Sequence, residues 1–117
     1  MIAHIVLFTP KLDLPAESFR AFTIQMGGCF RSIDSISRVT VGRRIAVDAG
    51  YPREFGDQTY QFAAVLEFRT RAGLIDYLRH PLHHELGRMF WESCERTVIS
   101  EVELHDGRDP AIAELLA

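Results

Sequence analysis

The fold is decided by the stretch TYQFAAVLEF, Thr59–Phe68, which is the strongest strand signal in the chain. Aromatic and aliphatic residues in such a run are typical of a β-strand. Because successive side chains of a strand point to opposite faces of a sheet, both faces can be read from the sequence. One face carries Tyr60, Phe62, Ala64, Leu66 and Phe68, and the other carries Ala63 and Val65. Both faces of this strand are largely apolar, so the sheet needs cover on both sides.

Three further strands are predicted on either side of this stretch, at Met1–Phe8, Ile36–Ile45 and Arg96–Leu104. The first is rich in Ile and Val and is also apolar on both faces. In the last, valines alternate with Glu101 and Glu103, as expected of a strand with one wetter face.

Helical patterns lie between these strands. The first begins at Asp13, which would cap the helix with Pro15 in its first turn, and runs through Met26. The second runs from a Thr70 cap to His80, where the following proline ends it, and the third is predicted over Pro81–Glu95.

Two segments show no periodic pattern of apolar residues. Residues 46–58 form a long loop, expected at a pocket mouth or at a subunit contact. Residues 105–117 form a C-terminal tail with a short helix at Ala111–Leu116, expected to dock on a neighbouring chain at a dimer interface. Residues 1–104 are predicted to be one domain.

The order β-α-β-β-α-β is typical of an α+β, ferredoxin-like domain, in which a four-stranded antiparallel sheet carries its helices on one face. That topology leaves no helix for the second face, and a monomer seldom exposes a large apolar surface to water. A second copy is the simplest cover. We therefore predict a homodimer in which two sheets close an α/β barrel of eight strands.

Composition narrows the function classes. The 117 residues are 47% hydrophobic and 25% charged, with a net charge of −3, which is ordinary for a soluble domain and offers no basic stripe for nucleic acid. The apolar run Ile2–Phe8 is too short to cross a membrane and lacks the flanks of a signal peptide, so we expect a cytoplasmic protein. Cys29 and Cys94, both in predicted helices, are expected to be free thiols. No GxGxxG, P-loop or cysteine pair is present, so no nucleotide, flavin or redox cofactor is predicted.

The chemistry-bearing residues gather around Pro81, in the stretch DYLRHPLHH, residues 76–84. The proline ends one helix and starts another, and it leaves a phenol and several imidazoles around one corner. His83, Leu86 and Phe90 follow i, i+3, i+7 spacing, which places the His83 imidazole along the edge of a buried stripe. Tyr77 lies about one turn before the proline.

This arrangement predicts acid-base chemistry. Partial burial would lower the imidazole pKa and keep His83 neutral, as a general base requires, and the Tyr77 hydroxyl could bind a developing enolate oxygen. The hypothesis is that the two groups act on an apolar carbonyl compound. The structural alternatives are a hydrogen bond from His83 that fixes the helix elbow and simple aromatic packing by Tyr77.

A metal site is not predicted. His80, His83, His84 and Glu85 contain the spacings that bind zinc on a helix. However, Pro81 breaks the helical register after His80, and the adjacent His83 and His84 diverge by about 100°. We expect His84 and Glu85 to lie on the solvated side of the helix.

The residues at this point resemble the stress-responsive A/B barrel domain proteins, which are small dimeric barrels of the ferredoxin-like group. The resemblance covers about residues 1–104. It rests on the opening MIAHIVLF, the Val39-x-x-Gly42 strand, the strand ending Leu66-Glu67-Phe68, and the Tyr77–His83 elbow.

One branch of that family is the plant polyketide cyclase that makes olivetolic acid, in which a pocket His and Tyr promote an intramolecular aldol closure. By similarity the pocket His falls on His83, its Tyr partner on Tyr77, and a further histidine on His4. A histidine in an apolar strand is more often a satisfied core residue than a ligand, which is the structural alternative for His4. The family enzyme's other pocket Tyr aligns near Gly27, and another His aligns near Phe62, so the two chains differ at these lining positions. The residues expected to line a substrate pocket are His4, Phe22, Phe62, Leu86 and Phe90.

Two other functions fit the resemblance. Related dimeric barrels include cofactor-free monooxygenases acting on aromatic polyketides, and the aromatic residues here, including Trp91, would suit such a substrate. A non-enzymatic dimer that binds apolar metabolites or protects other components during stress needs no particular imidazole.

Overall fold

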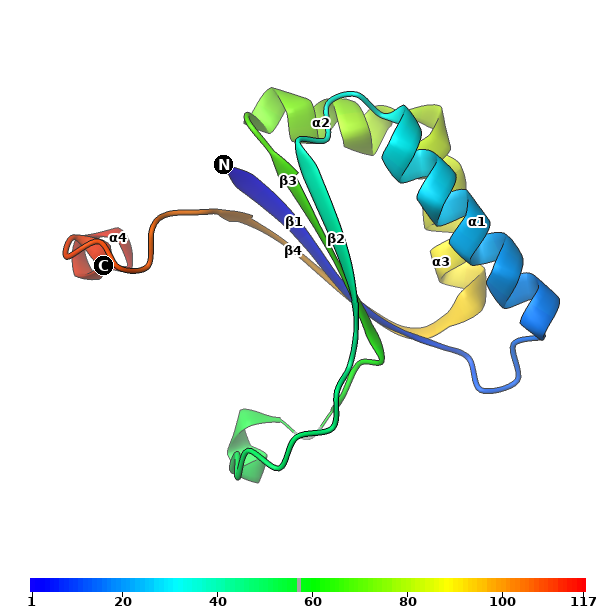
Figure 1. The fold of residues 1–117 in the computed structure, drawn as a ribbon, viewed down its shortest axis with the longest axis horizontal. Coiled ribbons are helices and arrows are strands. Elements are labelled where there is room, and N and C mark those ends of the chain that lie inside the picture. Colours follow the sequence, from blue (N-terminus) through cyan, green and yellow to red (C-terminus); the bar gives the residue numbers. More distant parts are fainter. Residues whose placement is uncertain (57) are drawn as a thin grey trace.

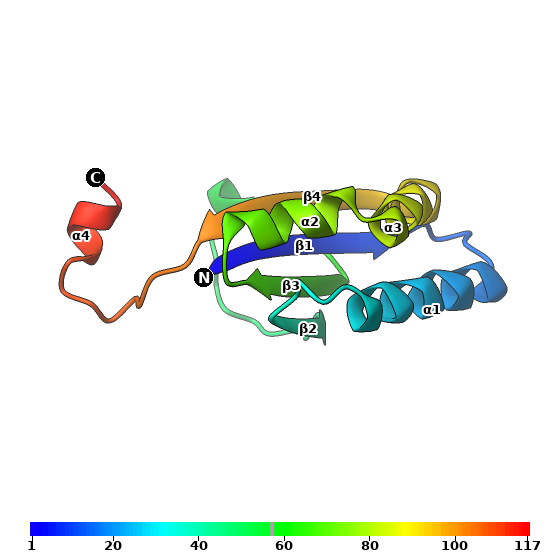
Figure 2. The same ribbon diagram turned by 90° about the horizontal axis from the view of Figure 1, so that it is seen from above.

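Four antiparallel strands form one sheet in the order β2-β3-β1-β4, and the helices α1, α2 and α3 lie on one face of it (Figures 1 and 2). The computed structural model describes residues 1–56 and 58–117. The elements are β1 (Ile2–Pro10), α1 (Ala16–Ser32), β2 (Arg38–Arg43), a 3-10 helix (Arg53–Phe55), β3 (Phe62–Phe68), α2 (Arg71–Arg79), α3 (Pro81–Ser93), β4 (Cys94–Glu103) and α4 (Ile112–Leu115). This is the predicted α+β, ferredoxin-like order, with the second helix broken in two at the elbow.

The register of the sheet confirms the predicted faces of its central strands. In β1, burial alternates so that Val6 and Phe8 face the helices, and their partners in β3 are Ala64 and Phe62. Ala64, Leu66 and Phe68 are almost fully buried on the same face. Period-2 alternation is a local property of extended chain, which is why the sequence predicts it well.

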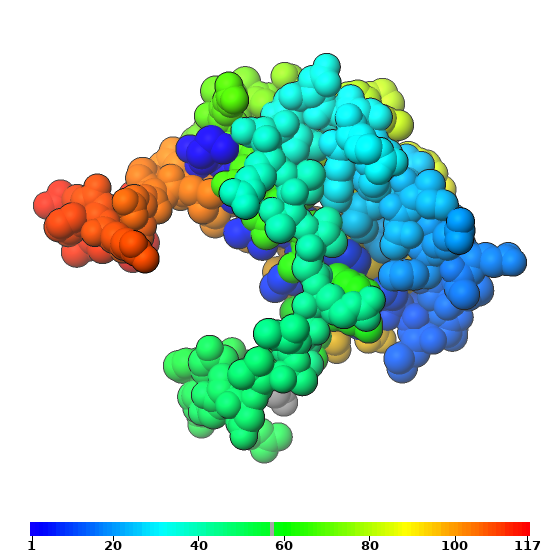
Figure 3. Space-filling view, in the orientation of Figure 1, coloured from blue at the N-terminus to red at the C-terminus, as the bar shows by residue number. Residues whose placement is uncertain are grey.

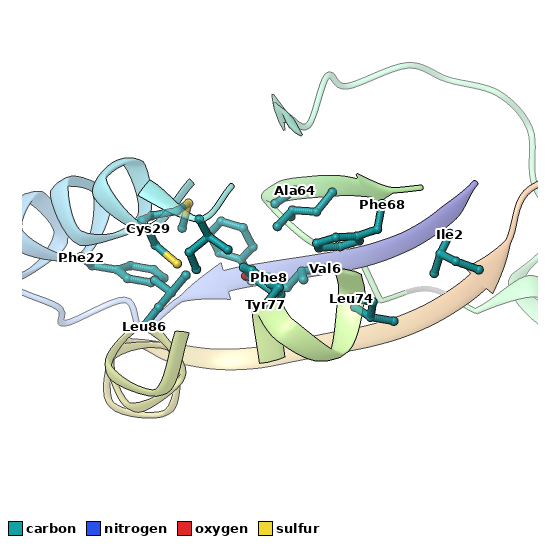
Figure 4. Close-up of a cluster of buried hydrophobic side chains, with 13 residues drawn as sticks. Ile2, Val6, Phe8, Phe22, Cys29, Ala64, Phe68, Leu74, Tyr77 and Leu86 are labelled. Atoms are coloured by element: carbon teal, nitrogen blue, oxygen red, sulfur yellow. The ribbon is translucent and has the colours of Figure 1, made fainter. Parts of the chain in front are cut away.

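The core lies between this face and the helices (Figure 4). Helix α1 contributes Phe22, Met26 and Cys29 to it. The rings of Phe8, Phe22 and Phe90 meet at centroid distances of 4.8–6.0 Å in edge-to-face contacts. Such contacts add about 0.5–1.5 kcal/mol each to the burial of the rings themselves.

Several predicted boundaries are wrong. Helix α1 has Pro15 at its N-cap and no side-chain cap bond, because Asp13 lies two residues before that position. Strand β1 continues to Pro10, which pairs with Cys94 after a shift of register. That pairing draws Cys94 into β4 rather than α3. Strand β2 is shorter than predicted, and β3 begins at Phe62. Cys29 and Cys94 are free thiols, as predicted.

The second face of the sheet is largely apolar and, in the described chain, carries no helix (Figure 1). Its polar members include Ser100 and Glu67, whose carboxylate lies 3.8 Å from Nε of Arg38 on the same face. The register places on it the side chains of Ala3, Ile5 and Leu7 from β1, Ala63 and Val65 from β3, and Val98 and Val102 from β4. Val98 and Val102 remain 44% and 36% exposed. Glu101 and Glu103, predicted on a wetter side, instead lie on the helix-covered face, because the edge position of β4 lets their carboxylates reach water there.

Two arms extend from the domain on the open side of the sheet: a loop arm, residues 44–56, and a tail arm, residues 105–117 (Figures 1 and 3). The radius of gyration is 16.1 Å, whereas a compact chain of this length has about 13 Å. No described residue of the loop arm lines the main cavity of its own chain, which leaves the other predicted place for this loop, a subunit contact. Among the described residues, no helix is long and apolar enough to cross a membrane.

Candidate functional site

A cavity of about 640 Å³ lies between the sheet and the α2–α3 elbow, a size within the range of small-molecule sites. It is lined by five predicted site residues, His4, Tyr77, His83, Leu86 and Phe90, together with Val6, Lys11, Phe30, Ala64, Leu66, Gly87, Trp91, Cys94, Glu95, Thr97 and Ile99. The wall is mostly apolar. The two imidazoles and the phenol lie together, with ring centroids 4.6–6.5 Å apart.

The elbow is built by local capping. Thr70 begins α2 by accepting a hydrogen bond from the Gly73 amide at 3.1 Å. His80 has extended backbone before Pro81, and its Nδ1 accepts a hydrogen bond from the Leu82 amide at 3.1 Å. His80 is therefore the N-cap of α3. His84, about one turn further along the chain, is exposed to solvent.

His83 is held in one tautomer. Its Nδ1 lies 3.0 Å from the Leu78 carbonyl oxygen, which can only accept, so Nδ1 carries the proton. In the neutral ring the lone pair is then on Nε2. Burial lowers the pKa of His83, and the neighbouring His4 and His84 lower it further, against the opposing hydrogen bond to Leu78. The ring can therefore be neutral and basic at neutral pH.

Tyr77 differs from His83 because its side chain can act as a hydrogen-bond donor rather than as a base. It is 2% exposed, and its ring centroid lies 4.6 Å from that of His83 and 5.6 Å from that of His4. Burial raises the pKa of the phenol above its ordinary value, with a smaller contribution from Cys29. Tyr77 therefore stays protonated and can donate a hydrogen bond. The structure gives its hydroxyl no hydrogen-bond partner among the described residues.

His4 is paired with a residue that the sequence analysis missed. Its Nδ1 lies 2.8 Å from Oε1 of Glu101, and the carboxylate accepts, so Nδ1 carries a proton and in the neutral ring the lone pair is on Nε2. His4 is 3% exposed, whereas the Glu101 side chain is 42% exposed. The two are cross-strand partners in β1 and β4. The available signal was the alternation of β4, but it needed the pairing of the first strand with the last.

Two predicted lining residues lie outside the cavity. Phe22 is fully buried in the core, with its ring 4.8 Å from that of Phe90, which occupies the cavity wall. Phe62 packs 5.5 Å from Phe8 and lines a separate, shallower groove that it shares with Arg43. Both rings pack against neighbouring aromatic rings near one end of the sheet. The spacing of Phe22 and Phe62 along the chain did not reveal these contacts.

The donor set does not form a metal site. Among the described residues, no group of three His, Cys, Asp or Glu side chains could hold a metal ion. His4 and His83, which face the same cavity, have ring centroids 6.5 Å apart. Their second nitrogens are committed to Glu101 and to a backbone carbonyl, an arrangement that orients two bases.

The chain resembles known proteins over most of its length. The model of the family described as "Stress responsive A/B Barrel Domain" matches residues 2–104. No curated protein sequence matches the chain.

Solved structures share the fold at low identity. A hydroxynitrile lyase from Passiflora edulis is 18% identical, with a TM-score of 0.75, and the match covers 92% of this chain and 96% of that one. A Dabb family protein with a ferredoxin-like fold from Mesorhizobium loti is 23% identical, with a TM-score of 0.68 and coverage of 89% and 97%. A dimeric ferredoxin-like protein of unknown function from Thermobifida fusca is 19% identical, with a TM-score of 0.69 and coverage of 88% and 90%.

Proposed function

The chain belongs to the stress responsive A/B barrel domain family, and from that premise we propose that it is a homodimeric enzyme whose cavity binds a small apolar carbonyl compound. The reaction proposed is cofactor-free acid-base catalysis of the aldol cyclisation type. A polyketide-like or aromatic substrate fits a cavity whose wall is mostly aliphatic and aromatic.

One observation carries this proposal: a neutral base, a protonated phenol and a second oriented imidazole share one cavity. Nε2 of His83 takes a proton from the carbon next to a carbonyl, and the Tyr77 hydroxyl donates a hydrogen bond to the enolate oxygen that forms. The enolate carbon then bonds to a second carbonyl carbon of the same molecule. The new alkoxide receives the proton from protonated His83, so the base is regenerated.

His4 and Glu101 support the same step. The carboxylate fixes the His4 ring with Nε2 as its basic nitrogen, so His4 can accept a hydrogen bond from substrate or relay a proton. A protein named as a hydroxynitrile lyase has a similar fold, and this similarity is a further reason to test the chain for carbonyl chemistry.

The homodimer is supported by the apolar second face of the sheet and by dimeric proteins of the same fold. Closing two such sheets into a barrel would remove this face from water. We also propose that the tail arm docks on the partner subunit. Its Leu115 and Leu116 are 45% and 79% exposed on the chain alone.

The decisive experiment separates the two roles of His83. Native mass spectrometry of the purified protein identifies a retained apolar carbonyl ligand, which is then tested for conversion. His83→Asn keeps an amide donor near the Leu78 carbonyl but has no basic nitrogen, whereas His83→Ala removes both. A catalytic role predicts that both variants lose about 10²–10⁴-fold in kcat, with the melting temperature kept by His83→Asn.

Tyr77→Phe completes this test. Because the hydroxyl has no hydrogen-bond partner among the described residues, we expect the fold to be kept and kcat to fall by about 10²–10³-fold. If the ligand is bound by all variants and converted by none, wild type included, the enzymatic proposal is wrong.

That outcome would favour a second function, a dimer that binds or sequesters an apolar metabolite. The hydrogen bond from His83 to Leu78 is the observation that favours it, because it ties α3 to the end of α2 and has a structural use without any reaction.

A further inference from the structure

We propose that each cavity is completed by the other subunit: the loop arm of the partner subunit covers the open side of the cavity and packs its aromatic residues against Trp91. The inference rests on the homodimer proposed above and goes beyond it, because it assigns a part of the binding site to the second copy.

The cavity is incomplete within one chain. Three of its lining residues lie along the side bounded by β4, and all three are exposed to solvent. The exposed fraction is 86% for Trp91 and 55% for Ile99, and Thr97 is exposed as well. Large apolar side chains that line a site for an apolar ligand are expected to be covered, since water at the wall weakens binding. Something outside this chain is therefore needed on that side.

The loop arm offers matching cover. Tyr51 and Phe55 are each 78% exposed, and their rings lie 6.4 Å apart as one small aromatic surface. Ile45 and Val47, in the same arm, are 77% and 66% exposed. The arm leaves the domain on the side of the sheet away from the helices (Figure 1), so these residues contact little of their own chain.

The strand order of the sheet brings the loop arm of one copy close to the cavity of the other. The strand order leaves β2 and β4 as the two edges, so a two-fold barrel with its axis along the barrel pairs β2 of one copy with β4 of the other. Arg43, Phe62, Phe8 and Thr97 lie in one row across the sheet. The end of β2, where the loop arm begins, is thus level with the rim of the partner's cavity, apart from the stagger of a closed barrel.

The loop arm is long enough for this contact. Face-to-face sheets stand about 10 Å apart, and the eight residues from Arg43 to Tyr51 span up to about 26 Å when extended. The arm can therefore pass the interface and still reach Trp91, even after a stagger of two or three residues. An arm folded on its own chain would not need this length.

Trp91 reports on this contact directly, because it is the only tryptophan in the chain. We expect its fluorescence in the wild-type dimer to be blue-shifted and protected from acrylamide. Tyr51→Ser with Phe55→Ser should shift the emission to the red and raise quenching severalfold, while sedimentation still gives a dimer. The matched control is Ile24→Ser, which removes an apolar side chain of α1 that is 59% exposed and does not line the cavity, and it should change nothing.

A photo-crosslink tests the same contact without weakening it. A benzophenone amino acid in place of Phe55 should join the peptide of the partner that contains Trp91. A dimer with solvent-exposed Trp91, unchanged by the double variant, or a crosslink found only elsewhere, overturns the covering arm and leaves the dimer standing. A monomer in sedimentation refutes the dimer itself, and the arm with it.

Discussion

At the scale of single residues, the site is defined by what burial does to different groups. The same apolar surroundings keep His83 unprotonated and Tyr77 protonated, because desolvation disfavours the charged form of each. The second nitrogen of each imidazole is committed to an acceptor, so the basic nitrogens of His4 and His83 are both specified. A base and a donor therefore arise from two side chains in one environment.

This burial has a consequence for stability. The pKa of His83 in the folded chain lies below 6.5, its ordinary value. Below pH 6.5 the unfolded chain therefore binds a proton at this residue more readily than the folded chain does. The contribution of His83 is fully present above pH 6.5 and is lost as the pH falls through the window down to the lowered pKa. We expect the free energy of unfolding of the wild type to fall more steeply as the pH is lowered below 6.5 than that of His83→Asn.

Urea titrations at one fixed protein concentration measure this difference, since the unfolding of a dimer depends on concentration. Parallel curves for wild type and His83→Asn across the window would show that the imidazole is not desolvated in the folded protein.

At the scale of elements, the elbow is held by caps on both of its helices. Thr70 caps α2 and His80 caps α3, and Pro81 takes the first position of α3, where its missing amide costs nothing. These caps fix the direction in which Tyr77 leaves one helix and His83 leaves the next. The elbow is therefore a local design that places two groups from different helices against one cavity.

Thr70→Ala should lower the free energy of unfolding by about 1 kcal/mol, because the Gly73 amide loses its acceptor at the start of α2. Thr23→Ala is the matched control. Its hydroxyl is exposed and bonds only to the Arg20 carbonyl within α1, so a change within about 0.5 kcal/mol is expected. Equal losses in both variants, measured by urea unfolding, would mean that the cap has no special role.

At the scale of the whole molecule, α1, α2 and α3 cover one face of the sheet, and the second face and both arms point away from these helices (Figure 1). The exposed apolar face is the reason for proposing a second copy, and the arms offer further surface through which two copies could contact one another. The cavity, by contrast, opens beside β4, which is an edge of the sheet in one chain.

Val102→Lys should dissociate the dimer, because it places a charge on the largely apolar face, where Val102 is 36% exposed on the chain alone. A cost of several kcal/mol corresponds to at least about a 100-fold rise in the dissociation constant. Ile24→Lys, at a position of α1 that is 59% exposed, is the control and should leave the dimer intact. Sedimentation equilibrium measures both, and a Val102→Lys variant that stays dimeric would place the interface elsewhere.

The tail arm can be examined in the same assay. A chain ending at Leu104 should still form dimers through the sheet but with weaker affinity, and an unchanged dissociation constant would separate the tail from the interface.

Much of this protein was specified by its sequence. The alternation in Thr59–Phe68 predicts a strand that is apolar on both faces, and Pro81 predicts the elbow with Tyr77 and His83 on either side of it, because these signals act over one or two turns of backbone. Boundaries were less certain, as Cys94 shows, since strand pairing with Pro10 decided where α3 ends.

Tertiary structure alone decided which distant side chains meet. Glu101 pairs with His4 across 97 positions of sequence because β4 lies beside β1, and Phe22 and Phe62 pack the core instead of lining the cavity because the rings of Phe8 and Phe90 lie against them. Periodicity gives each side chain a face of its own element, but the contacts between elements depend on the register and order of the strands, which no local pattern encodes.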